Sequence, residues 1–424
     1  MGEDRIKCVN ADCNATILPS TVLKYGGLCG GCSIKQDQAD RAEYIRKNRR
    51  TVNLFEGITD PVAIIQIVHS PRKHDPLIQY QPPPCPVEEL YGSLDDAQAH
   101  ALLGVAVDAM IAGDQELSEE IGKHLSVLTD QCLDPLLEVW LDRGELWPSI
   151  LFRSAGHRIR DRVVAMLEKA EGNVGHFLSA LAWIGGVEVE RLFRSWEAHP
   201  PAWRSALHVG PAGYAHVAGW EPGSHHRHQL FHDSCLGISV EQTGQIDPAV
   251  QLMRATAGKC PWCTGPLVHL VELNTLDPRL GFLGSVAPTL PVLTCDRCTC
   301  FTEHLFARVD EDGHATWHPG NRCPQWLPKN LDQWTANPWS GVPISLKPRR
   351  AIQAADWCMQ LPMSQIGGLP GWVQDSSYPI CPDCGRTMIF VAQIDNSQFA
   401  HEEGVFYAFL CAECRTTATA YQQS

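Results

Sequence analysis

The chain has 424 residues and a formal net charge of −14, with 44% hydrophobic and 19% charged residues. The length predicts two to four domains, and the composition is that of a globular protein, which argues against wholesale disorder. The acidic balance argues against a generalised binder of nucleic acid or anionic membranes, because such proteins contact phosphate through clustered Lys and Arg.

Cysteine usage points to metal binding in a reducing compartment. The chain has 18 cysteines, and twelve of them form pairs separated by two or four residues, whereas a secreted protein would spread them as a disulfide framework. The amino terminus lacks the apolar core of a signal peptide. The longest apolar run, around residues 101–112, contains Asp108 and is too short to span a bilayer. We therefore predict a cytoplasmic protein with no membrane partner.

The first predicted domain, residues 1–50, is a zinc ribbon followed by a basic helix. Glycines beside its second cysteine pair let the backbone fold back, so that four sulfurs converge on one zinc ion; the predicted ligands are Cys8, Cys13, Cys29 and Cys32. The helix, from about residue 33 to 50, ends in the cations Arg46, Lys47, Arg49 and Arg50. These residues either contact phosphate or an acidic partner, or they form a solvated helix end.

Residues 51–93 are predicted to be a proline-rich linker, because the proline-dense stretch 69–86 cannot sustain a helix or a central strand. A helical domain is predicted over residues 94–220 from apolar residues at spacings of three and four. Seven apolar residues between Leu125 and Trp140 match seven between Leu181 and Trp196 at one fixed offset. This weak repeat resembles stacked HEAT-type helical hairpins, with a plain helical bundle as the alternative.

Residues 221–244 are predicted to be a histidine-rich connector. His228 and His232 would lie one turn apart if the segment were helical, a spacing that can chelate zinc. Catalytic zincins use a glutamate as general base between such histidines, but Gln229 stands in that position and cannot accept a proton. The segment is therefore either a polar loop or an additional metal or partner contact.

The last predicted domain, residues 245–424, contains one cysteine pattern twice. Each copy has a Cys-x-x-Cys knuckle, an alternating strand-like run and a second knuckle about 30 residues later. The predicted ligands are Cys260, Cys263, Cys295 and Cys298 in the first copy, and Cys381, Cys384, Cys411 and Cys414 in the second. Metal would fix the register of paired strands, which otherwise slips easily by one residue.

Four thiolates fill the coordination sphere of tetrahedral zinc, which favours a structural role over hydrolysis. The alternatives are an iron–sulfur cluster or a redox dithiol. Cys300 and Cys323 lie near the first copy and could replace one of its ligands.

Residues 365–424 contain three motifs: a Gly-Gly-x-Pro-x-Trp element (Gly367 to Trp372), a Cys-Pro-x-Cys-Gly strand that ends in Gln393 and Asp395, and an aromatic Phe-x-Cys-x-x-Cys segment that ends in Tyr421 and Gln422. With these motifs the segment resembles the YwqG-like family of bacterial proteins. The same pattern is similar to the carboxyl-terminal part of the programmed cell death protein 2 family, whose members act as chaperones for a ribosomal protein. The resemblance implies a zinc-binding fold with a binding role rather than a reaction.

Together these observations predict a multidomain α+β protein with three parts: an amino-terminal zinc ribbon, an all-α HEAT-like or bundle middle, and a duplicated zinc-knuckle antiparallel β-rich domain. About three structural zinc ions are expected. We expect an interaction protein without enzyme activity, either an immunity protein or a chaperone or adaptor that shields an unidentified protein partner. Trp372 is either an anchor for that partner or a residue of the core. The alternatives are a nucleic-acid-associated zinc-ribbon regulator and a zinc-dependent hydrolase centred on His228 and His232.

Overall fold

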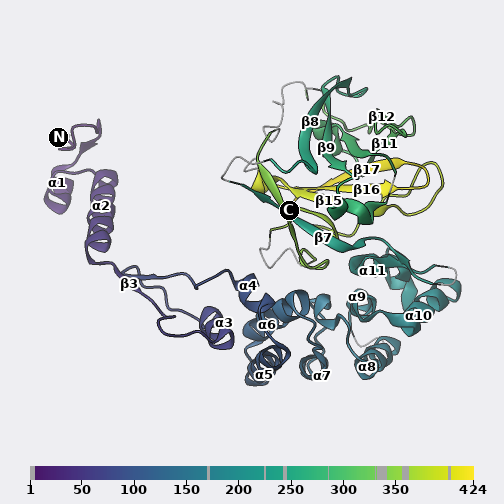
Figure 1. The fold of residues 1–424 in the computed structure, drawn as a ribbon. Coiled ribbons are helices and arrows are strands. Elements are labelled where there is room, and N and C mark those ends of the chain that lie inside the picture. The colour runs from purple at the N-terminus through teal and green to yellow at the C-terminus, as the bar shows by residue number, and fades with distance from the viewer. Residues whose placement is uncertain are drawn as a thin grey trace. The chain divides into compact units, whose positions relative to one another are not determined.

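The computed structural model describes nine stretches of the chain: residues 5–169, 172–223, 226–241, 246–284, 286–329, 331, 341–355, 362–399 and 403–424 (Figure 1). The fold mixes helices with antiparallel sheets. Contacts divide the chain into two compact units, Met1–Ser93 and Leu94–Ser424.

The first unit begins with a short hairpin and a long helix. Its elements are β1 (Ile6–Lys7), β2 (Thr16–Ile17), α1 (Pro19–Tyr25), α2 (Gly30–Asn48), β3 (Arg50–Val52), α3 (Pro61–His69), β4 (Ile78–Tyr80) and α4 (Val87–Gly92). The helix expected near residues 33–50 is confirmed as α2. Between His69 and Val87 the chain has no helix, as the proline-dense stretch predicts, but α3 and α4 lie on either side of it within the predicted linker 51–93. Asp60 accepts a hydrogen bond from the backbone of Val62 and so caps α3. The strands β3 and β4 pair in parallel.

The second unit begins with helices: α5 (Asp96–Ala112), α6 (Gln115–Leu128), α7 (Asp134–Asp142), α8 (His157–Glu168), α9 (Val174–Ile184), α10 (Gly186–Ala198) and α11 (Pro211–Ala215), with short 3-10 segments η1 (Ser149–Phe152), η2 (Ala202–Ala206) and η3 (His216–Ala218). The offset repeat found in the sequence falls on two helix pairs, α6–α7 and α9–α10. All seven of its apolar residues in the first pair are buried, and four of the seven in the second. The repeat therefore coincides with two helical hairpins that bury equivalent faces.

Two antiparallel sheets follow. The larger has eight strands in the order β12-β11-β17-β16-β15-β14-β7-β13 and the smaller has the order β10-β9-β8. The strands are β7 (His232–Val240), β8 (Val250–Lys259), β9 (Pro266–Asn274), β10 (Thr289–Thr294), β11 (Leu305–Val309), β12 (Ala315–Trp317), β13 (Ile344–Pro348), β14 (Gln365–Gly368), β15 (Ile389–Asp395), β16 (Val405–Cys411) and β17 (Thr416–Gln422).

One apolar core lies between these sheets. It contains Leu270 and Val292 of the small sheet together with Ile366 and Ile394 of the large one. A separate short ribbon pairs β5 (Trp220–Glu221) with β6 (His228–Gln229), and the helical turns α12 (Asp296–Thr299), η4 (Pro278–Leu283) and η7 (Asn396–Gln398) lie in connections.

The two cysteine groups of the second unit occupy the same local topology. In each, the first knuckle precedes a strand, a 3-10 turn and an antiparallel partner strand that leads into the second knuckle. Val268, five residues after Cys263, pairs with Thr294, while Ile389, five residues after Cys384, pairs with Leu410. Thr294 and Leu410 each directly precede a cysteine, so the register relative to the cysteines is identical.

The second knuckles differ. Cys411 ends β16, and a hairpin then returns the chain as β17, with Arg415 at a φ of 51°. Cys295 instead caps the helical turn α12, and the following strand β11 pairs with β17 rather than with β10. Because of this helical turn, β11 joins the large sheet.

A strap over the large sheet comprises residues 369–375. Buried side chains from four adjacent strands hold its backbone: Gln365 donates to Leu369 O at 2.9 Å, Gln393 accepts from Gly371 N at 2.9 Å, and Tyr407 donates to Gly371 O at 2.8 Å. Gln422 accepts from the backbone N–H of Gln374 and donates to the carbonyl of Asp375. A side chain on Gly371 would meet the carbonyl of Ala354 at 1.9 Å, so only glycine fits there.

Arg350 connects the helices to the sheet region within the second unit. Its guanidinium donates to the carbonyls of Val127 at 3.2 Å and Thr129 at 3.1 Å, at the carboxyl end of α6, and it pairs with Asp130. Carbonyls at a helix end have no partner within the helix, so an arginine satisfies them favourably. Among the residues that the structure describes, none of the helices has the length and apolar composition needed to cross a bilayer.

Candidate metal centres

Three groups of four cysteines have sulfur atoms that all lie within 4.8 Å of one another in each group. They are Cys8, Cys13, Cys29 and Cys32; Cys260, Cys263, Cys295 and Cys298; and Cys381, Cys384, Cys411 and Cys414. All twelve predicted ligands are thus brought together in the predicted quartets. Four convergent thiolates can hold a metal ion and are compatible with zinc.

The amino-terminal group joins the β1–β2 hairpin to the start of α2. Cys29 is the N-cap of α2, and its sulfur accepts a hydrogen bond from the backbone of Cys32. The backbone of Cys29 in turn donates to the sulfur of Cys8 at 3.2 Å. The N–H of Cys32 lowers the pKa of Cys29 to about 7, while the neighbouring Cys29 raises the pKa of Cys32 to about 12. Deprotonation of Cys29 is therefore favoured, and deprotonation of the neighbouring Cys32 is opposed. A bound divalent cation would stabilise both as thiolates.

The middle group is the most deeply buried, since Cys260, Cys295 and Cys298 are each no more than 1% exposed. The Cys260 and Cys298 sulfurs are 3.7 Å apart, and those of Cys263 and Cys295 are 3.5 Å apart. Leu267, Leu293 and Leu305 pack around the group together with Trp262. The cysteine Cys295 lowers the pKa of Cys260, and Cys260 raises that of Cys298.

The carboxyl-terminal group lies nearer the surface, with Cys384 exposed and Cys381 buried. Its first knuckle matches that of the middle group in detail. The N–H of Gly385 donates to Cys381 O at 2.9 Å, as the N–H of Thr264 does to Cys260 O. Both donors have positive φ, 72° for Gly385 and 60° for Thr264. The backbone N–H of Arg386 lowers the pKa of Cys384 to about 6.

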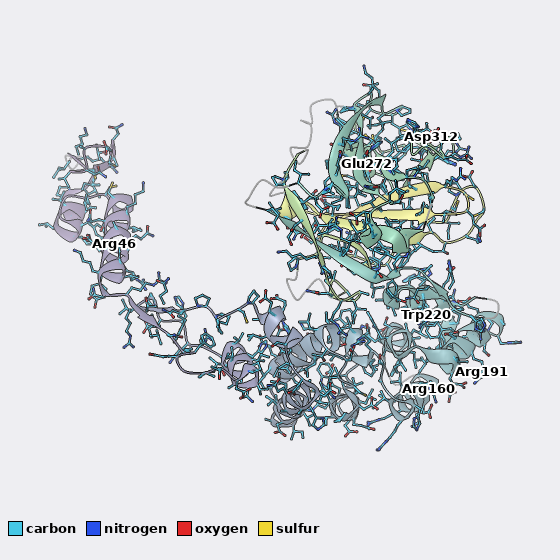
Figure 2. All side chains as sticks on the ribbon, viewed as in Figure 1. Arg46, Arg160, Arg191, Trp220, Glu272 and Asp312 are labelled. Carbon is cyan, nitrogen blue, oxygen red and sulfur yellow. The ribbon has the colours of Figure 1, made fainter. Side chains whose placement is uncertain are left out.

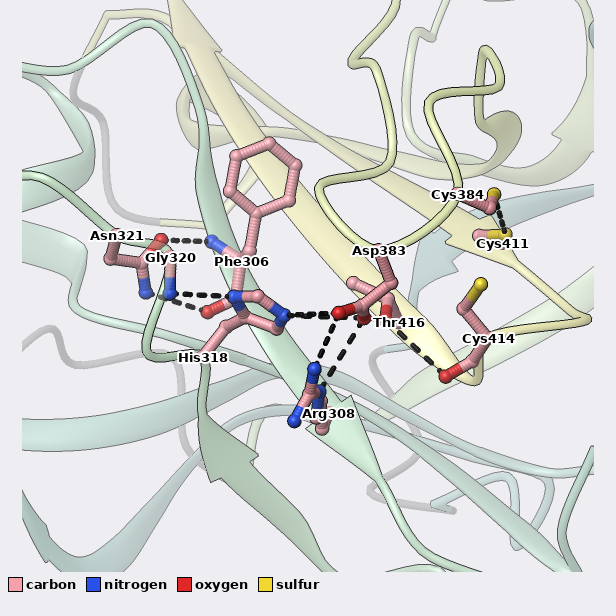
Figure 3. A network of polar contacts seen from close by, with 10 residues as sticks. All are labelled: Phe306, Arg308, His318, Gly320, Asn321, Asp383, Cys384, Cys411, Cys414 and Thr416. Carbon is pink, nitrogen blue, oxygen red and sulfur yellow. Dashed lines mark hydrogen bonds and ion pairs between the residues drawn. The ribbon is translucent and has the colours of Figure 1, made fainter.

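Asp383, between two cysteines of this group, is the centre of a polar network (Figure 3). Its carboxylate accepts from Arg308 of β11, from Thr416 Oγ1 at 2.9 Å and from His318 Nε2 at 3.2 Å. The backbone N–H of Gly320 donates to His318 Nδ1, which places the proton of the neutral ring on Nε2. The Arg308 guanidinium lowers the pKa of Asp383 to about 2. The network ties the carboxyl-terminal knuckle to β11 and to the loop after β12.

The predicted alternative ligands do not join these groups. Cys300 donates to the carbonyl of Asp296 at 3.4 Å, and Cys323 is exposed. A fourth, exposed group consists of Asp310, Asp312 and His314 (Figure 2). Asp310 accepts hydrogen bonds from the backbone of the other two, which is the geometry of a tight turn.

The expected helical pairing of His228 with His232 is wrong. His228 belongs to β6 and His232 begins β7, because residues 228–229 and 232–240 form strands rather than a helix. His228 Nδ1 lies 2.9 Å from Glu221 Oε1, while His232 packs against the ring of Phe282. Within the described residues neither histidine joins a metal-capable group. Residues 224–225, which include His225, and residues 242–244 of the predicted connector lie outside the described residues.

The remaining predicted contact residues divide into exposed and buried ones. Arg46, Lys47, Arg49 and Arg50 are exposed at the end of α2 and the start of β3. Figure 2 labels Arg46. Glu43 pairs with Lys47 at 2.7 Å and with Arg46 at 3.8 Å. Of the two roles considered for Trp372, the structure agrees with core packing, because the side chain is 7% exposed and stacks on Tyr407 with ring centroids 4.7 Å apart.

Asp383 and His318 were missed by sequence reasoning. Asp383 carries one signal, its position inside the knuckle Cys-Pro-Asp-Cys. His318 is 65 residues away in sequence, and only the antiparallel pairing of β12 with β11 and of β11 with β17 brings it near the knuckle.

No family model and no solved structure matches the chain. The uncharacterized protein YpfL of Salmonella typhimurium strain LT2 is 36% identical over 429 aligned residues, which cover all of both chains. At this identity and coverage, the chain belongs to the family of the uncharacterized protein YpfL.

Proposed function

We propose that this protein is a zinc-stapled interaction protein that binds and shields a protein partner, as an immunity protein, chaperone or adaptor does. One observation carries the proposal: each of the three metal-capable quartets consists of cysteine sulfur alone. Four thiolates leave zinc no position for water or substrate, so the ions hold the fold instead of catalysing a reaction. Cysteines kept reduced for metal fit a cytoplasmic protein.

The finer architecture follows from the same proposal. The amino-terminal quartet is a zinc ribbon, and the identical strand register around the other two quartets supports a duplicated zinc-knuckle domain. The helix pairs α6–α7 and α9–α10 support a HEAT-like arrangement of the kind that presents binding surfaces. Relationship to the YwqG-like and programmed cell death protein 2 families is part of the proposal. Two residues support it: Gln393 and Gln422 belong to the motifs that carry the resemblance, and the side chains of both form hydrogen bonds with the backbone of the strap.

Nucleic-acid binding is the weaker alternative, because the net charge of −14 opposes contact with phosphate. The test is native purification of the zinc-loaded chain from cells that produce it at its natural level. We expect a protein partner in a fixed stoichiometric ratio that survives nuclease treatment. Recovery of the chain alone, or of a complex that nuclease dissolves, would contradict the proposal.

A further inference from the structure

The amino-terminal module differs in charge from the rest of the chain. Residues 1–50 carry nine Lys and Arg against six Asp and Glu, a net charge of +3, while the whole chain has a net charge of −14. The other 374 residues therefore carry −17. Such asymmetry points to a partner of opposite charge at the module.

The same module exposes large aliphatic side chains. Five of the fifteen large apolar side chains that the described residues expose lie between residues 6 and 34; we call them the ribbon apolar set: Ile6, Val9, Leu18, Leu23 and Ile34. Leu23 is 90% exposed. Neither α1 nor α2 has a buried residue, so Leu23 and Ile34 add nothing to a core of the module.

A lysine directly follows three members of this set in the sequence. Lys7 follows Ile6 in β1, Lys24 follows Leu23 in α1, and Lys35 follows Ile34 in α2, and all three lysines are exposed. Aliphatic side chains offer nothing to phosphate or to stacked bases, which bind through cations and aromatic rings. Aliphatic and cationic side chains together instead complement a segment that presents apolar and carboxylate groups.

Building on the proposed function, we infer that the ribbon apolar set and its lysines are the docking site for an acidic amphipathic segment of a protein partner. The aliphatic side chains would bury against the apolar face of the segment, and the lysines would face its carboxylates. A metal ion bound to the amino-terminal quartet would fix the β1–β2 hairpin and the start of α2, from which Ile6, Lys7, Ile34 and Lys35 project.

The test uses the full, zinc-loaded chain and a labelled synthetic helix of Leu, Glu and Ala, with Leu on one face and Glu on the other. We expect saturable binding that weakens as salt rises and is lost when Lys replaces Glu in the probe. The double substitution Leu23→Ser and Ile34→Ser should weaken binding roughly tenfold or more. Val187→Ser, at a side chain 78% exposed in α10, is the matched control and should leave binding unchanged.

Metal content and thermal unfolding of the double variant should equal those of the parent chain, since both side chains are exposed. Absence of probe binding, tighter binding of a DNA duplex, or equal affinity of the double and control variants would each overturn the inference. The outcome is separable from that of the proposed function: if the double variant still recovers the cellular partner, the interaction role stands and only this docking site is wrong.

Discussion

Asp383 accepts a hydrogen bond from Nε2 of His318 at 3.2 Å, and this contact joins the loop after β12 to the knuckle between Cys381 and Cys384. The His318 side chain is 4% exposed, whereas that of Asp383 is 22% exposed. The Asp383 carboxylate, which lies beside a candidate metal centre, thus accepts the N–H of the buried His318 ring.

Asp383→Ala should therefore destabilise the second unit by about 1–3 kcal/mol, because the His318 N–H loses its acceptor in a buried position. Chemical denaturation followed by tryptophan fluorescence measures the change. Asp312→Ala, at an exposed turn, is the control and should have little effect. Equal stability of the two variants would show that the network contributes nothing.

Tyr407→Phe should destabilise the strap. The hydroxyl donates to Gly371 O at 2.8 Å and accepts from Val373 N at 3.1 Å, and the side chain is fully buried. Removing it leaves two backbone groups without a partner, at a cost of about 1–3 kcal/mol. The exposed Tyr44→Phe is the matched control. Hydrogen exchange at Val373 should speed up in the Tyr407 variant only; unchanged protection there would contradict this role.

Arg350→Lys should weaken the connection between the helices and the sheet region. Lysine keeps the charge but cannot reproduce the planar set of donors that reaches Val127 O, Thr129 O and Asp130. We expect a loss of about 1–2 kcal/mol, with faster hydrogen exchange at the end of α6. Arg158→Lys, at a side chain 82% exposed in α8, is the control. Equal exchange rates in both variants would refute the connecting role.

Stability should fall as the pH drops from about 7.5 to 5.5. Burial lowers the pKa of His269, His232 and His304, so unfolding takes up protons at these sites. Above the unfolded histidine pKa of about 6.5 these side chains are neutral in both states, and the fold is at its full stability. As the pH falls from there toward the lower pKa of the folded state, the unfolded chain gains protons that the folded chain does not, and the free energy of unfolding decreases. His269→Gln should flatten the slope, whereas the exposed His314→Gln should not. A slope that is unchanged in the His269 variant would contradict the assignment.

The cysteine quartets could be predicted from sequence because short knuckle spacing and flanking glycines are local signals. The strand runs around them, such as β9 and β15, follow the same local alternation. Pairing between distant segments was not predictable. α12 and the hairpin at Cys411 follow equivalent cysteines, yet β17 pairs with the strand before its knuckle, β16, whereas β11 pairs with β17. The stacking partner of Trp372 was not predictable either, because Tyr407 lies on a distant strand.

Metal content tests the central claim most directly. Native mass spectrometry of the chain, purified without chelator, should show zinc in three sites, one for each cysteine quartet. The double substitution Cys381→Ser and Cys384→Ser should remove one ion and abolish cooperative unfolding of the sheet region, because metal binding there is coupled to folding. A parent chain without zinc, or a double variant that retains three ions and unfolds as the parent does, would contradict the account.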